Sequence, residues 1–362
     1  MRKTGYVIYT NIDRNPRSPY YNTTSISKIY DLSQCPLGHI DNFYVSWFNG
    51  LSSVFQIDST ILTGKGIDAD AAVLVRDYDS YITTISDNVF NAATSLVTVD
   101  IPLLTTIGSN AFNCCYSLSS ITLSQVTFIG ESAFNKCSNL TSVSLPYAVT
   151  INSCAFYSCH NLESVNIQQM SYIPDYAFAE CWKLTNIKAP NVLKIGQWAF
   201  GMCVKLSELF FPNVVEIYSY AFHSCSGVVS AYFPNVSKIG CYAFNYCESL
   251  ENILIPKISI VLTGAFYGCN NLTSIVLPNV TYLGEDCFGG CKKLSSISIP
   301  NVETISSYAF ARCMNLEAIS LPRITFIGKN AFSDCTNLKS IYVPLSMIND
   351  LNSDYSSLYV VI

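Results

Sequence analysis

The chain has 362 residues, of which half are hydrophobic and 12% are charged, so it can build a large core and does not belong to the disordered class. Its formal net charge is -5, and its Lys and Arg residues form no block along the sequence. The composition therefore offers no basic footprint for nucleic acid or an anionic membrane, and it predicts neither as a partner.

Residues 1–70 contain no repeat and are rich in Tyr, Asn, Ser and Pro. The segment begins with basic residues, but Thr10, Asn11 and Asp13 interrupt the apolar run that a secretory signal requires. It either folds alone or docks on a partner. We expect a non-repetitive N-terminal arm or adaptor that docks on a larger assembly, because polar terminal segments become ordered when something ties them down.

Beyond this arm, phenylalanine recurs at every twenty-second position without insertion or deletion. The positions are Phe90, Phe112, Phe134, Phe156, Phe178, Phe200, Phe222, Phe244, Phe266, Phe288, Phe310 and Phe332. Such a strict period requires geometrically identical coils. A unit this short cannot bury an apolar face alone, so successive coils must stack on one another.

Other columns share this period, and the unit from Ala265 to Gly284 reads A-F-x-x-C-x-x-L-x-x-I-x-L-P-N-V-x-x-I-G, with Leu283 in place of the last Ile. The L-x-x-I-x-L segment alternates as a short strand does, so each coil should add one strand to a parallel sheet. Proline ends the strand because it has no N–H for the ladder. The glycine that ends the unit is expected to adopt a positive φ; it occurs at Gly108, Gly130, Gly196, Gly240, Gly284 and Gly328.

This unit, matched throughout residues 82–344, resembles the BspA-type leucine-rich repeat. Pattern and resemblance together predict a repeat solenoid of about 12 coils over residues 71–344, with a parallel β-sheet on one face and short turns, 3-10 or strand segments on the other. Residues 345–362 lose the period and are expected to form a C-terminal cap, in which Leu351, Leu358 and Ile362 could cover the last coil.

The resemblance also implies a role. The family includes surface and secreted proteins of bacteria and parasitic protists, and the P-N-V-x-x-I-G variant is similar to repeats of bacteriophage tail-associated proteins. Its members bind host proteins, matrix or other cell surfaces. The family has no catalytic motif, so the resemblance assigns no active-site residues.

Eleven of the 16 cysteines occupy one column, three residues after Phe: Cys115, Cys137, Cys159, Cys181, Cys203, Cys225, Cys247, Cys269, Cys291, Cys313 and Cys335. A column of equivalent inward positions indicates small buried hydrophobic side chains, so reduced thiols are expected there. A disulfide between Cys114 and Cys115 is the minor alternative. Pairs with zinc-finger spacing do not occur, so neither a metal nor another cofactor is expected.

Few other residues could carry chemistry. His160 follows Cys159, but a Cys–His pair needs an exposed thiolate, and Cys159 is expected to be buried. A loose acidic run consists of Asp68, Asp70, Asp77, Asp79 and Asp87. Its spacing fits no calcium loop, and a solvated end of the array is the favoured interpretation. We therefore expect no catalytic residue.

One residue per strand, between the inward columns, should project from the exposed face of the sheet. In the middle of the array these residues are Phe210, Tyr232, Leu254 and Val276, which we call the strand-face row; Lys188 precedes them, and Glu208, Asn186, Asn252 and Ser274 flank them. An apolar patch with a polar rim is typical of a binding site. A ladder of β-forming residues that stabilises an exposed sheet explains the row equally well.

A second row lies two positions before Phe and consists of Tyr176, Trp198, Tyr220 and Tyr242, which we call the turn-edge row. Aromatic rows of this kind stack on sugar rings or fill an interface. They also pack against each other, and the sequence leaves both interpretations open.

The sequence thus predicts a non-enzymatic protein that displays an extended repeat surface to a protein or glycan on a host or cell surface. An initiator Met, no export signal and the repeat variant favour a phage tail or virion component anchored by its N-terminal arm. The alternative is a bacterial or protist cell-surface adhesin. A third reading, a tail-associated glycan-degrading enzyme, requires two carboxylates about 5 to 10 Å apart. Glu163, Glu208, Glu251 and Glu317 lie in different coils without an evident partner.

Overall fold

The computed structural model describes residues 6–12, 24–31, 56–57, 74–76, 83–345 and 353–362. The chain divides into two compact units, one of residues 1–170 and 180–188, the other of residues 171–179 and 189–362. The repeats form a parallel β-solenoid of about 12 turns with almost no helix, which confirms the predicted fold class. Most of the expected N-terminal arm and the boundary near residue 70 lie outside the described residues.

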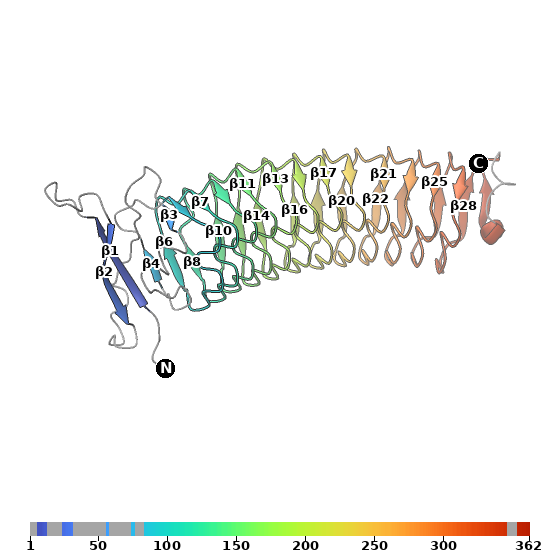
Figure 1. The fold of residues 1–362 in the computed structure, drawn as a ribbon. Helices are drawn as coiled ribbons and strands as arrows, with labels where there is room; N and C mark the ends of the chain where they lie inside the picture. Colours follow the sequence, from blue (N-terminus) through green and yellow to red (C-terminus); the bar gives the residue numbers. More distant parts are fainter. Residues whose placement is uncertain (1–5, 13–23, 32–55, 58–73, 77–82, 346–352) are drawn as a thin grey trace. The chain divides into compact units, whose positions relative to one another are not determined.

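In the first unit, each coil has one strand on the L-x-x-I-x-L side, and from the second of these strands onward each coincides with a predicted L-x-x-I-x-L segment. These strands are β4 (Leu74–Arg76), β6 (Thr98–Asp100), β8 (Ser120–Ile121), β10 (Ser142–Ser144), β12 (Ser164–Asn166) and β14 (Asn186–Lys188). A second parallel ladder runs along another side of the same coils, formed by β3 (Gln56–Ile57), β5 (Thr84–Ile85), β7 (Thr106–Ile107), β9 (Phe128–Ile129) and β11 (Thr150–Ile151) (Figure 1). Ahead of both, β1 (Tyr6–Ile12) and β2 (Thr24–Asp31) pair antiparallel.

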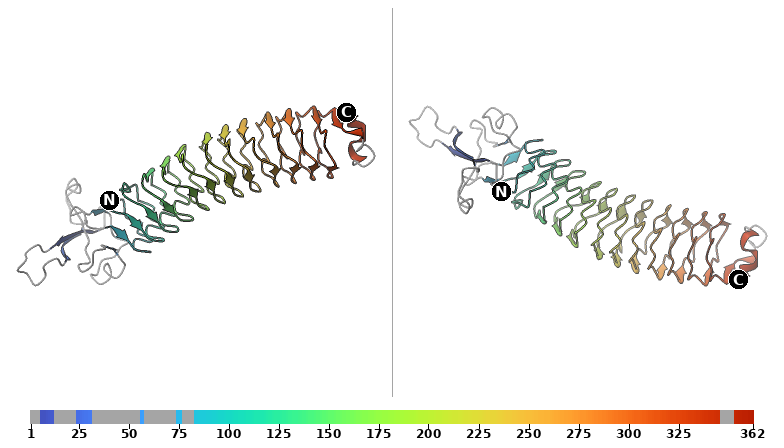
Figure 2. Two further views of the ribbon diagram at one scale, coloured as in Figure 1. Left: turned by 90° about the horizontal axis from the view of Figure 1, so that it is seen from above. Right: turned by 90° about the horizontal axis from the view of Figure 1, so that it is seen from below.

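The second unit repeats this arrangement (Figure 2). Its L-x-x-I-x-L strands are β16 (Glu208–Phe210), β18 (Ser230–Tyr232), β20 (Asn252–Leu254), β22 (Ser274–Val276), β24 (Ser296–Ser298), β26 (Ala318–Ser320) and β28 (Ser340–Val343). Its two-residue strands are β13 (Tyr172–Ile173), β15 (Lys194–Ile195), β17 (Glu216–Ile217), β19 (Lys238–Ile239), β21 (Ile260–Val261), β23 (Tyr282–Leu283), β25 (Thr304–Ile305) and β27 (Phe326–Ile327). The register places each residue beside its equivalent in the next coil, as in the pairs Phe210–Tyr232 and Tyr232–Leu254.

The phenylalanine column forms the core of each unit, and each of its rings is at most 3% exposed. In the first unit, the rings from Phe90 to Phe156 stack with centroids 5.1 to 5.4 Å apart. In the second unit, the rings from Phe178 to Phe332 stack at 5.3 to 5.7 Å. The alanine beside most of these rings is also buried, because a larger side chain would not fit in the same layer.

The prediction of a positive φ for the glycine that ends the repeat unit is wrong. Among the described glycines, the left-handed ones are Gly264, Gly268 and Gly290. A Cβ on Gly108 would lie 2.5 Å from the main-chain nitrogen of Asp87 in the preceding coil, and a Cβ on Gly240 would lie 2.3 Å from that of Ser219. Glycine is therefore needed in these coils so that neighbouring backbones can approach closely.

The left-handed residues lie instead two positions before and two positions after Phe, and most of them are not glycine. In the coil of Phe134 they are Ser132, with φ of 54°, and Lys136, with φ of 61°. The N–H groups of Ser132, Phe134 and Lys136 donate to carbonyl groups of the next coil at 3.0, 2.7 and 2.7 Å. These hydrogen bonds between coils hold the turn in a conformation that costs a residue with a Cβ about 1 kcal/mol.

The last coil is covered by the C-terminal segment. A 3-10 helix, η5 (Ser353–Leu358), places Tyr355 edge-on to Phe332, with ring centroids 5.5 Å apart. The Tyr355 hydroxyl accepts a hydrogen bond from the Phe332 N–H, and β29 (Tyr359–Val361) pairs with β28. Tyr355 therefore covers the last coil, whereas Ile362 is exposed and Leu351 lies outside the described residues.

We expect Phe244→Ala to lower the free energy of unfolding by about 3 to 5 kcal/mol, because it leaves a cavity between the rings of Phe222 and Phe266. Phe210→Ala removes the same side chain from the exposed face of β16 and should cost less than about 1 kcal/mol. Urea denaturation followed by circular dichroism measures both values. Equal losses would contradict the assignment of the core.

We also expect Lys136→Gly to raise the free energy of unfolding by about 0.5 kcal/mol. Glycine removes the left-handed strain of the folded state, but it also makes the unfolded chain more flexible, and this entropy offsets part of the gain. The matched control is Lys205→Gly. Lys205 is an exposed lysine that is not among the left-handed residues, so this change should lower the same quantity by about 0.5 to 1 kcal/mol. If both variants lose stability to the same extent in urea denaturation, the strain assigned to the turn is absent.

Candidate functional site

The strand-face row lies where the sequence predicts it, on the exposed side of β16, β18, β20 and β22. Inward-pointing Leu209, Ala231 and Ile275 are buried, whereas the four residues of the row are exposed, Phe210 by 67% and Val276 by 64%. The rings of Phe210 and Tyr232 stack with centroids 5.1 Å apart. Tyr232, Leu254 and Val276 line one open depression of about 440 Å³, so the row forms a continuous apolar surface.

Polar residues surround this surface in the second unit. Glu208, Asn252 and Ser274 begin strands β16, β20 and β22 and are exposed. Lys188 and Asn186 belong to β14 of the first unit, where both are exposed and Lys188 is in register with Asn166 of β12. The predicted rim within the second unit therefore consists of Glu208, Asn252 and Ser274.

The turn-edge row forms a stack. The ring centroids of Tyr176 and Trp198 are 6.1 Å apart, those of Trp198 and Tyr220 5.0 Å, and those of Tyr220 and Tyr242 5.0 Å, with interplanar angles of 14° or less. All four side chains are half-buried. The rings therefore pack against each other, one of the two interpretations that the sequence offered, and a role in binding stays a prediction.

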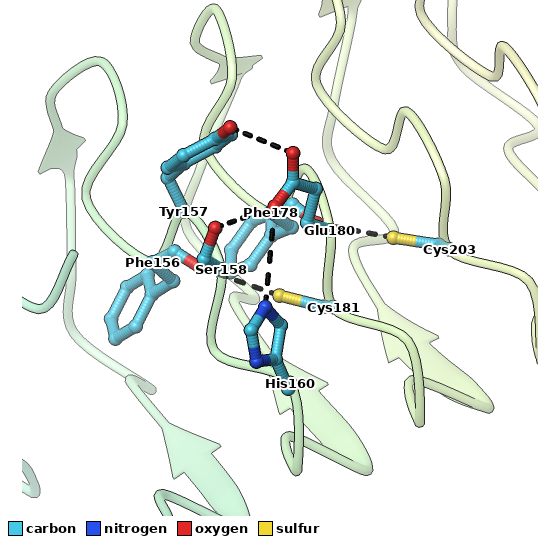
Figure 3. Close-up of polar contacts among 8 residues, drawn as sticks. All are labelled: Phe156, Tyr157, Ser158, His160, Phe178, Glu180, Cys181 and Cys203. Carbon is cyan, nitrogen blue, oxygen red and sulfur yellow. Dashed lines mark hydrogen bonds and ion pairs between the residues drawn. The ribbon is translucent and has the colours of Figure 1, made fainter. Parts of the chain in front are cut away.

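A polar cluster that the sequence did not reveal lies in the first unit (Figure 3). Glu180 accepts hydrogen bonds from the Tyr157 hydroxyl and the Ser158 hydroxyl, each at 2.7 Å. The Nε2 atom of His160 lies 4.0 Å from Oε2 of Glu180, and the His160 ring stacks on Trp182 at 3.8 Å. The signal that could have predicted this cluster is the repeat spacing, which places Glu180 directly beside Ser158 in the adjacent coil.

The geometry of this cluster is that of a contact between coils. Ser158 is buried and donates to Glu180, so its hydroxyl hydrogen does not point toward a histidine base. The hydrogen bond that Tyr157 donates to Glu180 raises the pKa of the Tyr157 hydroxyl, so this phenol stays protonated. Cys159 is buried, as predicted, and burial raises the pKa of its thiol strongly, which removes the nucleophile that a Cys–His pair would need.

Ten of the eleven column cysteines are buried, and within the described residues none of the eleven forms a disulfide. Each thiol donates to the main-chain carbonyl oxygen of the Phe in the preceding coil, as Cys181 does to Phe156 at 3.3 Å and Cys203 to Phe178 at 3.1 Å (Figure 3). Burial raises the pKa of Cys225 and Cys291 to about 12. Cys335 in the last coil is only partly buried. The column therefore contributes packing and hydrogen bonds between coils, and burial keeps its ten buried thiols from acting as nucleophiles.

The remaining candidates lie apart from any described cluster. Asp87 accepts a hydrogen bond from the Ser109 N–H at 2.7 Å, which ties two coils together, and Asp68, Asp70, Asp77 and Asp79 lie outside the described residues. Within the described ranges, no three His, Cys, Asp or Glu side chains converge as metal ligands. In the same ranges, no helix has the length and apolar character that crossing a membrane requires.

We expect the ten column cysteines from Cys115 to Cys313 to resist iodoacetamide at pH 8 in the native protein, because the thiolate is the reactive form and burial keeps it unpopulated. Among the column thiols, Cys335 should react first, since it is the most exposed. Mass spectrometry of digested samples, with a sample labelled in urea as the control, gives the order of reaction. Rapid native labelling of Cys225 or Cys291 would contradict the packing of the column.

Comparisons with known proteins agree with this architecture. The sequence model of one family, described as BspA type leucine rich repeat region (6 copies), matches residues 77–173, 149–263 and 259–356. A search of curated proteins gave no match. Among solved structures, a leucine-rich repeat protein from Bacteroides ovatus is 23% identical with a TM-score of 0.66, and the similarity covers 98% of each chain. A leucine rich cell surface protein from Faecalibacterium prausnitzii is 25% identical with a TM-score of 0.46, over 81% of this chain and 84% of that one.

Proposed function

The chain belongs to the BspA-type leucine-rich-repeat family, and from this premise we propose that it is a binding protein at a cell surface and not an enzyme. Leucine-rich-repeat proteins of this type are typically cell-surface proteins, and they generally bind other proteins or ligands. The observation that carries the proposal is the exposed strand-face row on β16, β18, β20 and β22, with its polar rim.

The chemistry of the row favours a protein as its ligand. Phe210 and Tyr232 offer large apolar rings, which are the side chains that most often anchor protein interfaces. Leu254 and Val276 extend this surface with aliphatic groups, which offer neither a flat ring nor a hydrogen bond to a sugar. A protein surface with an apolar centre matches this composition, and Glu208, Asn252 and Ser274 would contact the polar periphery of such an interface.

Stacking between coils does not cover the residues of the strand-face row. Phe210 and Tyr232 stack on each other, as a ladder of β-forming residues would, yet Phe210 and Val276 remain about two-thirds exposed. Each square ångström of apolar surface that a partner covers contributes about 25 cal/mol. The uncovered part of the row is therefore available for binding.

The sequence favoured a virion component, with a cell-surface adhesin as the alternative. The family match supports the adhesin better. Docking of residues 1–70 on an assembly partner stays part of the proposal. Among the carboxylates considered for a glycan-degrading enzyme, Glu317 accepts a hydrogen bond from Lys339 at 3.1 Å. This pairing between coils explains Glu317 without a catalytic role.

Attachment to cells tests the proposal. We expect the full-length protein on fluorescent beads to attach saturably to epithelial cells, and to lose this attachment when the cells are treated with protease. The double variant Phe210→Ser and Tyr232→Ser should attach about tenfold more weakly, because it removes both aromatic anchors.

The matched control is the double variant Tyr282→Ser and Phe326→Ser, which removes one exposed tyrosine and one exposed phenylalanine from β23 and β27. It should attach like the unchanged protein. The proposal fails if both double variants attach equally, or if attachment survives protease and is lost when the cell-surface glycans are removed.

A further inference from the structure

The turn side of the second unit contains a groove of about 650 Å³ that the strand-face row does not reach. Tyr242, Tyr246, Tyr267 and Tyr308 line it together with the carboxylates of Glu285 and Asp286. It lies on the coils that include β19, β21, β23 and β25, near the turns that carry the Phe column. The combination of several aromatic rings and acidic groups in one concave site is what a ligand-binding groove requires.

The groove exists because glycine replaces large side chains in three columns. Gly264 and Gly268 occupy the positions of Tyr242 and Tyr246 one coil later, and a Cβ on them would lie 2.2 and 2.8 Å from those rings. Gly289 occupies the position of Tyr267 one coil later, and its Cβ would lie 2.9 Å from that ring and 3.0 Å from Oδ1 of Asp286. The rings of these three tyrosines therefore lie directly on the bare backbone of the next coil, where a side chain would displace them.

Two of the rings form a corner. The centroids of Tyr246 and Tyr267 are 5.5 Å apart, and the ring planes are perpendicular at 90°. Tyr308, which is exposed, lines the groove as well. The pair is edge to face, and an organic cation placed over the face of either ring would be attracted by its negative π-surface.

The electrostatics of the groove point to the same class of ligand. Asp286 is partly withdrawn from water beside Glu285, and both effects raise the pKa of the Asp286 carboxyl above its ordinary value. Arg312 opposes this rise, but its Nε atom also lies 3.9 Å from Oδ2 of Asp334. Asp286 and Asp334 thus share the charge of Arg312, and a positively charged ligand would relieve the repulsion between Glu285 and Asp286.

We propose that this groove binds an alkylammonium group, either the side chain of a lysine or a small quaternary amine. The tyrosine rings contact its apolar methyl or methylene groups, and Glu285 and Asp286 neutralise its charge. A neutral sugar would also stack on the rings, but it would add no positive charge to that of Arg312 against the carboxylates of Glu285, Asp286 and Asp334. This site is independent of the strand-face row and adds a second ligand to the proposed function.

The test uses two pairs of probes. The two members of each pair differ in charge and are similar in shape. Choline is compared with its neutral isostere 3,3-dimethylbutan-1-ol, and the peptide acetyl-Gly-Lys-Gly-amide is compared with the same peptide containing norleucine in place of lysine. Isothermal titration of the full chain should give affinities about tenfold higher for the cationic member of at least one pair. The pair with the larger difference identifies the source of the cation.

Variants locate the binding within the groove. Glu285→Gln with Asp286→Asn should weaken binding of the cation about tenfold, and Tyr308→Leu, at an exposed position that cannot disturb the core, should also weaken it. Glu251→Gln, an exposed carboxylate in another part of the same unit, is the matched control and should change nothing. The double variant of Phe210 and Tyr232 should bind the cation normally, which separates this test from that of the strand-face row.

The proposal is overturned if neither cationic probe binds better than its neutral counterpart. It is equally overturned if the Glu285 and Asp286 variant, shown by circular dichroism to be folded, binds as the unchanged chain does. Saturable binding of maltose at this groove, with no preference for choline over its isostere, would identify a neutral sugar site and contradict the assignment of a cation.

Discussion

The structure depends on the contact between one coil and the next. Within each unit the rings of the Phe column lie 5.1 to 5.7 Å apart and nearly parallel, so each ring inside a stack is covered by a neighbour on both sides. The turn N–H groups and the cysteine thiols donate to carbonyl groups of adjacent coils, which adds directional bonds to the apolar stack. A coil in isolation would lose all of these interactions, so stability accumulates only along the array.

This construction separates the interior from the surface. The positions that face inward are fixed by the layer geometry, because a side chain of another size would disturb both neighbouring coils. The positions that face outward contact the same column in adjacent coils and little else, as the rings of Phe210 and Tyr232 do. A repeat protein of this kind can therefore change its binding surface one coil at a time without changing its fold.

The sequence predicted the core well because periodicity reports directly on which side chains share a layer. The Phe and Cys columns, the L-x-x-I-x-L strands and the exposed strand-face row all follow from the constant spacing of the repeat. The backbone conformation of the turn could not be predicted in the same way. Its left-handed positions carry Asn, Tyr, Lys, Ser and Trp as well as glycine, so residue type did not mark them.

The groove in the second unit could not be predicted from the sequence, for a related reason. A cavity arises where large side chains are missing from several columns at once. The period of a repeat marks the residues that recur and does not mark the positions where a large side chain is missing. Gly264, Gly268 and Gly289 belong to no recurring column of the repeat. Their effect depends on the tyrosines of the preceding coils, Tyr242, Tyr246 and Tyr267, whose rings lie on them.

The left-handed turn positions have a consequence for how such a groove can arise. At most backbone positions, exchanging a large residue for glycine loosens the chain, but Gly264 and Gly268 have φ of 60° and 73°, a region where glycine is the least strained residue. Tyr242 and Tyr246 occupy the equivalent positions one coil earlier with φ of 57° and 56°. Replacing a tyrosine by glycine at such a position therefore removes a ring from this edge and relieves strain in the turn at the same time.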